Sequence, residues 1–343
     1  MESLPGGKIA VAVSGGSDSL ALMHLLAAHA RARRAPAPVV LTVDHGLRAD
    51  SARDARKVLA WAKALGLKAH RLVWRGGKTE RGVEAAAREA RYRLMGDWLT
   101  RYGFTALYVA HSQDDQAETF LLRLARGSGL DGLSAMRPLS PWPLPGFEGF
   151  AVARPLLGID RATLRDFLRR RGQEWLDDPM NDDPHFDRVK MRRAAAALAE
   201  AGLSAARIAN AAAHLARARE ALEAASEAVL LRACRPVRKS DRIGSEAVLL
   251  DPAALAAAPR ELGLRALAHV LMQVGGQGYR PRFEALERLF DRLTAGTLGG
   301  GATLHGCRIA PAGARLRVFG AETLVIGREN PRKGSGRGGK TTA

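Results

Sequence analysis

The sequence predicts an α/β protein in which a parallel sheet, covered by helices on both faces, is followed by an α-rich second domain and a small C-terminal β element. Three features of the sequence indicate this fold class. Short apolar runs alternate with longer helical patterns over the first ~115 residues, as in strand–helix units. An Ala-rich stretch over residues 193–232 has Leu, Ile and Arg at helical spacing. Apolar and polar residues then alternate around glycines over residues 299–326.

Four apolar runs in the first part of the chain are short enough for buried strands, and each precedes a helical pattern. The strands are expected at residues 9–14, 39–44, 67–74 and 107–110. The helices that follow them are expected at residues 20–30, 51–65, 83–102 and 114–124. Repeated units of this kind form a parallel sheet, whose ligands lie beyond the carboxyl ends of the strands.

A proline-rich break, PLSPWPLP at residues 138–145, separates these units from the later elements. Residues 151–157 then predict a further strand, and residues 161–171 predict a helix. Further helices are expected over residues 193–232, 252–274 and 282–293, and a small β hairpin or meander over residues 299–326. The expected domains are therefore an α/β domain (1–200), a helical domain (201–295), a small β element (296–330) and a disordered basic tail (331–343).

The composition narrows the classes of protein to which the chain can belong. Its 343 residues carry 53 Lys and Arg against 35 Asp and Glu, a formal net charge of +18, and such a surface attracts polyanions such as nucleic acid. The alternative is a solvated basic surface. Two cysteines, Cys234 and Cys307, make no disulfide framework and no metal-ligand cluster. No uncharged apolar run approaches the ~18 residues that span a bilayer, so we expect a cytoplasmic protein without membrane contact.

A Gly/Ser-rich segment lies between the first expected strand and the first expected helix, and it reads Ser14-Gly15-Gly16-Ser17-Asp18-Ser19. Small residues allow a sharp turn and a close approach of a phosphate to the backbone amides, and a helix N-terminus adds unpaired N–H groups. The hydroxyls of Ser14, Ser17 and Ser19 can donate to phosphate oxygens. Asp18 would repel a bare triphosphate, so it favours a bridging Mg²⁺. The alternative is an ordinary turn in which Ser17 or Asp18 caps the helix.

Polar residues also follow the second and fourth expected strands, at Asp44–Arg48 and His111–Glu118. Parallel strands end at the same edge of their sheet, so these clusters converge there with the Gly/Ser-rich segment. Asp115 and Glu118 lie three residues apart at the start of a helix and therefore share one face. The alternative is that both acids only stabilise the helix N-terminus.

Several motifs in this order resemble the N-type ATP pyrophosphatase (PP-loop) superfamily, and within it the tRNA(Ile)-lysidine synthetase family. They are SGGSDS from Ser14, VDHGLR from Val43, HSQDDQAET from His111 and WLDDPMND from Trp175. The resemblance extends over residues 8–195 and implies a Rossmann-like sheet and cleavage of ATP between its α and β phosphates. Family members adenylate the carbonyl oxygen of the wobble cytidine in an isoleucine tRNA with a CAU anticodon. The ε-amino group of free lysine then attacks carbon 2, which expels AMP and gives lysidine.

The resemblance also implies roles for individual residues. Asp18, Asp115 and Glu118 are the expected catalytic residues; Asp18 handles ATP and its Mg²⁺, and Asp115 and Glu118 bind lysine. The expected ATP-binding residues are Ser14, Gly15, Gly16, Ser17, Asp18, Ser19, Asp44, His45 and His111. The expected tRNA-binding residues are Arg88, Arg91, Arg188 and Arg192, and the second domain is the expected tRNA-holding element. Its helical patterns offer further arginines for phosphate contacts, at Arg207, Arg217, Arg219, Arg232, Arg235 and Arg238.

The same residues leave other interpretations open. A tRNA thiolation enzyme shares the loop but needs catalytic cysteines or an iron–sulfur cluster, and a non-catalytic RNA-binding protein would not need the carboxylates. Arg88, Arg91 and His111 can equally be structural residues. The chain departs from the family pattern at Gly82, Met180 and Val189, which leaves the roles of Asp178 and Asn181 open. A homodimer is compatible with these observations.

Overall fold

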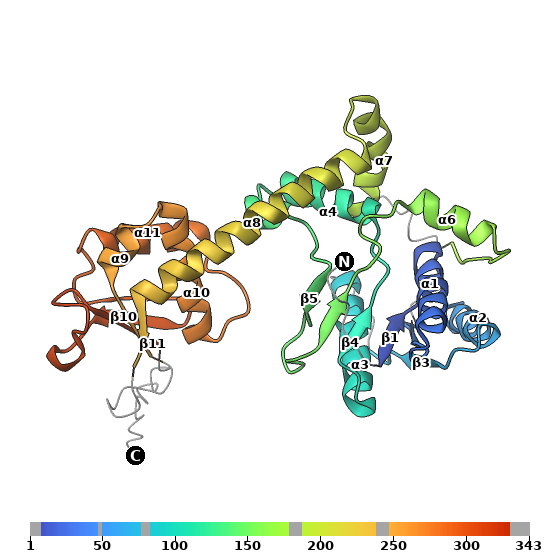
Figure 1. Cartoon of the computed structure of the whole chain (residues 1–343), viewed down its shortest axis with the longest axis horizontal. Helices are drawn as coiled ribbons and strands as arrows, with labels where there is room; N and C mark the ends of the chain where they lie inside the picture. Colours follow the sequence, from blue (N-terminus) through green and yellow to red (C-terminus); the bar gives the residue numbers. More distant parts are fainter. Residues whose placement is uncertain (1–7, 47–49, 77–82, 178–186, 238–246, 330–343) are drawn as a thin grey trace, which may run out of the picture. The chain divides into compact units, whose positions relative to one another are not determined.

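The computed structural model describes residues 8–46, 50–76, 83–177, 187–237 and 247–329 (Figure 1). The chain divides into two compact units, Met1–Arg217 and Ala218–Ala343. The predictions for Arg48, Asp178, Asn181, Arg238 and the tail 331–343 lie outside the described residues. The predicted domain boundaries at residues 200, 295 and 330 stay predictions. Within the described residues, no helix is both long and apolar enough to cross a bilayer.

The first unit is built on a six-stranded sheet of order β3-β2-β1-β4-β6-β5. Five of its strands are parallel to one another: β1 (Ile9–Ala12), β2 (Val39–Asp44), β3 (Ala69–Val73), β4 (Ala106–Tyr108) and β6 (Ala151–Ala153). This parallel sheet confirms the predicted α/β class. The antiparallel edge strand β5 (Leu139–Pro141) lies inside the segment that was predicted to be only a proline-rich break. An edge position tolerates proline because the missing N–H faces no second partner strand.

Helices cover both faces of this sheet, and each face has its own core. Residues that alternate along the strands point to opposite cores, as Val11 and Tyr108 do against Ala10 and Leu107. One core contains side chains of α1 (Ser17–Arg33), α2 (Ser51–Ala64) and α6 (Arg161–Arg169), and the other contains those of α3 (Val83–Tyr102). The strand ends of this two-faced sheet carry the candidate site.

Three further helices of the first unit lie next to the candidate site. They are α4 (Gln113–Ala125), the short α5 (Leu130–Leu133) and α7 (Asp187–Glu200), and α4 packs against both of the others. The backbone N–H and the hydroxyl of Ser112 both donate to Asp115 Oδ2, at 2.9 and 3.1 Å, which closes the start of α4. The long α8 (Ala205–Ala233) follows α7 and continues into the second unit.

The second unit combines a five-stranded antiparallel sheet, of order β7-β8-β11-β10-β9, with α9 (Pro252–Ala256), α10 (Arg260–Gly275) and α11 (Phe283–Thr294). Strands β9 (Ala302–Leu304), β10 (Cys307–Pro311) and β11 (Leu324–Arg328) form the predicted meander. Strands β7 (Cys234–Pro236) and β8 (Val248–Leu250) were not predicted. The single helix predicted over 252–274 is wrong, since the chain breaks at Pro259.

Candidate active site

The site lies where the strand order of the first sheet reverses. Strand β1 pairs with β2 on one side and with β4 on the other. The segments that leave β1 and β4 at their carboxyl ends therefore border one crevice, which is the usual ligand site of such sheets. The first of these segments is the Gly/Ser-rich loop Ser14–Ser19, and the second runs through His111 into α4.

The Gly/Ser-rich loop is held by hydrogen bonds among its own residues. Ser19 Oγ accepts from the N–H of Ser14 at 3.2 Å and donates to the carbonyl of Gly16 at 2.9 Å. Gly16 is the N-cap of α1 and makes no side-chain hydrogen bond, so the alternative in which Ser17 or Asp18 caps the helix is wrong. With no cap side chain bonded to them, the amides at the start of α1 suit a phosphate.

Gly15 shows why this loop needs glycine. Its φ of +94° lies in the left-handed region, and a Cβ there would stand 2.5 Å from Leu176 Cδ1. The N–H of Leu176 donates to the carbonyl of Gly15 at 2.9 Å. The WLD motif that starts at Trp175 therefore packs under the loop, so that two motifs distant in the sequence meet in the structure.

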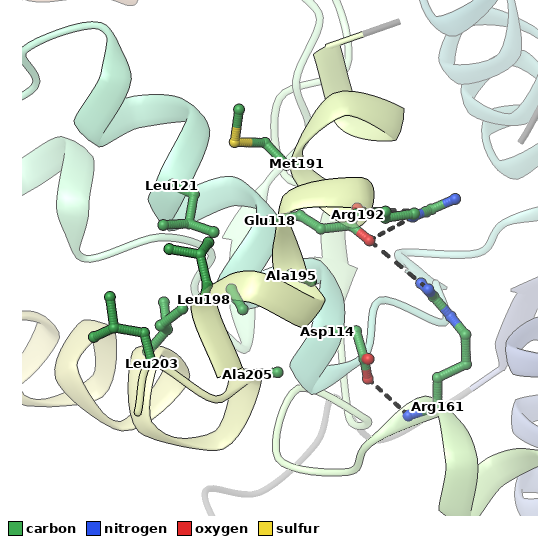
Figure 2. Close-up of a pocket in the computed structure, with 12 residues that line it drawn as sticks. Asp114, Glu118, Leu121, Arg161, Met191, Arg192, Ala195, Leu198, Leu203 and Ala205 are labelled. Carbon is green, nitrogen blue, oxygen red and sulfur yellow. Dashed lines mark hydrogen bonds and ion pairs between the residues drawn. The ribbon is translucent and has the colours of Figure 1, made fainter. Parts of the chain in front are cut away.

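The three acids predicted to be catalytic converge on one side chain, Arg161, which the sequence analysis did not single out. Arg161 Nε lies 3.1 Å from Asp18 Oδ2, Nη2 lies 3.4 Å from Asp115 Oδ1, and Nη1 lies 3.7 Å from Glu118 Oε1. Asp18 comes from α1 and the other two acids come from α4. We call Asp18, Asp114, Asp115, Glu118, Arg161 and Arg192 the charged cluster. Figure 2 shows its members Asp114, Glu118, Arg161 and Arg192.

Arg161 contacts the acids of this cluster through its backbone as well as through its guanidinium. Its backbone N–H donates to Asp114 Oδ2 at 2.8 Å, so the first residue of α6 is tied to the first turn of α4. Burial lowers the pKa of the Arg161 guanidinium, but the charge of Asp115, followed by that of Asp18, outweighs this and raises the pKa above its ordinary value. The guanidinium is therefore a permanent cation among acids.

Arg192, which was predicted to bind tRNA, contacts the predicted lysine site. Its Nε donates to Glu118 Oε1 at 2.6 Å and its Nη2 donates to Oε2 at 3.4 Å, a two-point pair between α7 and α4. The Glu118 side chain is only 8% exposed, so this pair is largely shielded from water. Arg188 lies on the same helix, and its side chain is outside the described residues.

His45 and Arg91, predicted for ATP and for tRNA respectively, contact each other. Arg91 Nε donates to His45 Nε2 at 3.4 Å, and the His45 ring meets Trp74 edge-on. Burial, followed by the charge of Arg91, lowers the pKa of His45 to about 4. His45 is therefore a neutral ring that accepts a hydrogen bond at neutral pH.

Asp44, at the end of β2, closes a turn. Its Oδ1 accepts from the N–H of Gly46 at 3.0 Å and from the hydroxyl of Ser51 at 2.6 Å. Burial raises the pKa of Asp44, yet these hydrogen bonds bring it below its ordinary value.

Two further predicted residues lie elsewhere in the first unit. The guanidinium of Arg88 lies 5.2 Å from the centre of the Tyr92 ring, and His111 precedes the start of α4.

A cavity of about 290 Å³ opens beside the charged cluster, between α4, α7 and the first turn of α8. Asp114, Glu118, Arg161 and Arg192 line one side of it. Apolar side chains line the rest: Ala117, Leu121, Met191, Ala195, Leu198, Leu203, Ala205 and Ile208. Figure 2 shows Leu121, Leu198 and Leu203 on the side away from Arg161. The cavity therefore suits a ligand with an apolar chain and a charged end.

Comparison with known proteins agrees with the motifs. Residues 1–198 match the PP-loop domain family. A tRNA(Ile)-lysidine synthase from Ruegeria pomeroyi is 43% identical over 326 residues, which are 94% of this chain and 74% of that protein. The tRNA(Ile)-lysidine synthase of a Bradyrhizobium species is 40% identical over 96% of this chain and 92% of its own length. A third, from Bradyrhizobium diazoefficiens, is 39% identical over 90% of this chain and 89% of its own length.

Proposed function

The chain belongs to the tRNA(Ile)-lysidine synthase family, and from this we propose that it uses ATP to form lysidine in an isoleucine tRNA. The substrates are ATP, free lysine and the tRNA with a CAU anticodon, and the products are lysidine, AMP and pyrophosphate. One observation supports this above the others: Asp18, Asp115 and Glu118 gather around a single guanidinium at the crevice that the phosphate loop borders.

The first step joins the tRNA to the nucleotide. The carbonyl oxygen on carbon 2 of the wobble cytidine attacks the α-phosphorus of ATP, an O–P bond forms, and pyrophosphate leaves. The Ser14–Ser19 loop and the start of α1 supply N–H and O–H donors for the phosphate oxygens. An oxide cannot leave carbon 2, whereas adenylate is a good leaving group, so this step prepares the second.

In the second step the ε-nitrogen of lysine attacks carbon 2, a C–N bond forms, and the C–O bond to AMP breaks. The amine must lose one proton before the attack and another after it. Asp115 and Glu118 provide acceptors for the ammonium, and the apolar wall of the cavity, including Leu121 and Leu198, provides a surface for the four methylenes of lysine.

Mg²⁺ fits the oxygen donors at the start of α1. Asp18 offers a carboxylate, and its Oδ1 lies 3.0 Å from the hydroxyl of Ser17. Mg²⁺ in nucleotide sites is bound through one or two carboxylates together with phosphates and waters, so one acid on the protein is enough. When bound, the ion neutralises charge that develops on the phosphates. Asp18, with Ser17 beside it, is therefore the proposed protein ligand.

The cysteines disfavour the thiolation alternative. Burial raises the pKa of the Cys234 thiol to about 12 and that of Cys307 to about 11. Sulfur transfer needs a thiolate, and neither side chain ionises near neutral pH. The proposed chemistry of the chain therefore rests on its carboxylates and not on its thiols.

The direct test is incubation with ATP, radiolabelled lysine and an isoleucine tRNA transcript that carries a CAU anticodon. We expect lysine-dependent pyrophosphate release and label in the tRNA, and a transcript with uridine at the wobble position should take up none. Asp18→Asn should abolish both signals. Pyrophosphate release without lysine incorporation would exclude the proposed reaction, and RNA binding without ATP cleavage would indicate the non-catalytic alternative.

A further inference from the structure

Arg161 occupies an unusual electrostatic position for a residue at the start of a surface helix. Its guanidinium, with a side chain only 21% exposed, is shared among acids from two different helices. The three distances, 3.1, 3.4 and 3.7 Å, come from three different nitrogens, so one planar group reaches three carboxylates. No other described residue is paired with Asp18, Asp115 and Glu118 together.

The charges of the cluster do not balance. Four carboxylates, those of Asp18, Asp114, Asp115 and Glu118, face two guanidiniums, those of Arg161 and Arg192. The formal sum is two negative charges. The four carboxylates repel one another unless a cation lies between them. Because two guanidiniums do not neutralise all four, the cluster still attracts further cations.

We propose that Arg161 is a positioning residue that holds these acids together before the cationic substrates arrive and that competes with those cations for the same oxygens. Mg²⁺ needs Asp18, and the ammonium of lysine needs Asp115 and Glu118; Arg161 contacts all three. Both cation sites, Mg²⁺ at Asp18 and the ammonium at Asp115 and Glu118, rest on the proposed function, but a measurement with Mg²⁺ alone needs neither lysine nor tRNA.

The experiment measures binding of Mg²⁺ alone, without ATP or tRNA, to the full-length chain. Thermal unfolding is recorded in EDTA and in millimolar MgCl₂ for the wild type, Arg161→Gln and Arg161→Lys. Arg170→Gln is the matched control, because Arg170 is an exposed arginine at the C-terminal end of α6, the helix that Arg161 begins. In EDTA, Arg161→Gln should have the lowest Tm, because its acids repel one another.

Addition of MgCl₂ should then stabilise Arg161→Gln more than the wild type. A tenfold gain in affinity corresponds to a Tm gain about 3–5 °C larger than that of the wild type. Arg161→Lys should lie between the two, since one ammonium cannot bridge three acids, and Arg170→Gln should match the wild type. An equal Mg²⁺ response in folded Arg161→Gln and wild type would overturn the proposal. If Arg161→Gln does not fold, a Mg²⁺ response of Arg161→Lys equal to that of the wild type would do the same.

Turnover gives a second readout that a purely structural role would not produce. In Arg161→Lys, kcat should fall because the acids are less well aligned, while the KM for lysine should stay equal or fall because the competing guanidinium is gone. A higher KM with an unchanged kcat would mean that Arg161 binds lysine instead of competing with it, and would contradict the proposal. If the wild type forms no lysidine, the proposed function fails, but the Mg²⁺ measurement still decides the competition.

Discussion

The properties of single side chains in the first unit depend on the groups that contact them. His45 is packed against Trp74 and accepts a hydrogen bond from Arg91, and its pKa of about 4 keeps it neutral. Glu118 is bonded to Arg192 at two points and pairs with Arg161 at 3.7 Å. His45 is therefore tested by a change of pH, and Glu118 by a substitution that removes its carboxylate.

The low pKa of His45 makes the protein less stable in mild acid. In the unfolded chain the ring has an ordinary pKa of 6.5, so between about pH 6.5 and pH 4 the unfolded state binds a proton that the folded state does not. Stability should therefore fall as the pH is lowered through this window. We expect the Tm of His45→Gln to fall less steeply over it than the wild-type Tm. His29→Gln, at an exposed position of α1, is the control and should follow the wild type; identical slopes for all three proteins would refute the assignment.

Replacement of Glu118 by alanine should chiefly impair the use of lysine. A hydrogen bond to a charged group contributes about 1.5–3 kcal/mol, so the KM for lysine should rise about 10- to 100-fold, with ATP use less affected. Initial rates at varied lysine and varied ATP separate the two effects. Glu89→Ala, which removes an exposed acid from α3, should leave both constants unchanged. An unaltered KM for lysine in Glu118→Ala would remove Glu118 from the lysine site.

Whole helices set the dimensions of the site. The cavity is bordered by α4 and α7, which are joined by the pair between Glu118 and Arg192, and by the first turn of α8. Ala195 lines this cavity from α7, whereas Ala197, two residues further along the same helix, does not. Both alanines are exposed, and leucine is a good helix former, so a larger side chain at either position should be tolerated by the fold.

Filling the cavity should therefore separate lysine binding from folding. Ala195→Leu should raise the KM for lysine about tenfold, which corresponds to a loss of ~1.4 kcal/mol of binding free energy. Its Tm should stay within about 1 °C of the wild-type Tm. Ala197→Leu is the matched control and should change neither quantity. Steady-state kinetics and thermal unfolding of the two variants check this. Equal KM values for both variants would show that the lysine chain lies elsewhere.

The elements differ in how far sequence alone could predict them. The loop Ser14–Ser19 and the start of α4 are local signals, because residue type and spacing there decide the turn and the helix N-terminus. The role of Arg161 is not local: it depends on how α6 packs against α1 and reaches α4, which no periodicity encodes. The pair between Arg192 and Glu118 depends likewise on the packing of α7 on α4. Strands of three residues, such as β5 and β7, take their structure from a neighbouring strand.

At the scale of the whole molecule, the net charge of +18 acts on any polyanion. Not every arginine contributes to such a surface. Arg219, one of the residues predicted to follow phosphates, is only 5% exposed, so that prediction is wrong for this side chain. Arg207 donates through Nη1 to the carbonyl of Gly202, and Arg235 lies over the ring of Phe319. We therefore expect phosphate contacts from a subset of the arginines.

Binding of tRNA should depend steeply on salt. If about six phosphates are neutralised, affinity should fall about 10³-fold between about 50 and 200 mM salt, because each contact releases a condensed counterion. Filter binding or fluorescence anisotropy over a series of KCl concentrations gives the slope. A nearly flat dependence would show that base contacts or a shape-based fit dominate recognition.

The contact between Gly15 and Leu176 determines how the protein can be dissected. Leu176 lies under the phosphate loop and bonds to its backbone, although it comes after the last strand of the first sheet. A truncated chain that ends at β6 would keep every strand of that sheet and lose the residue that supports the loop. We therefore expect that the smallest piece of this chain able to hold a nucleotide includes residue 176.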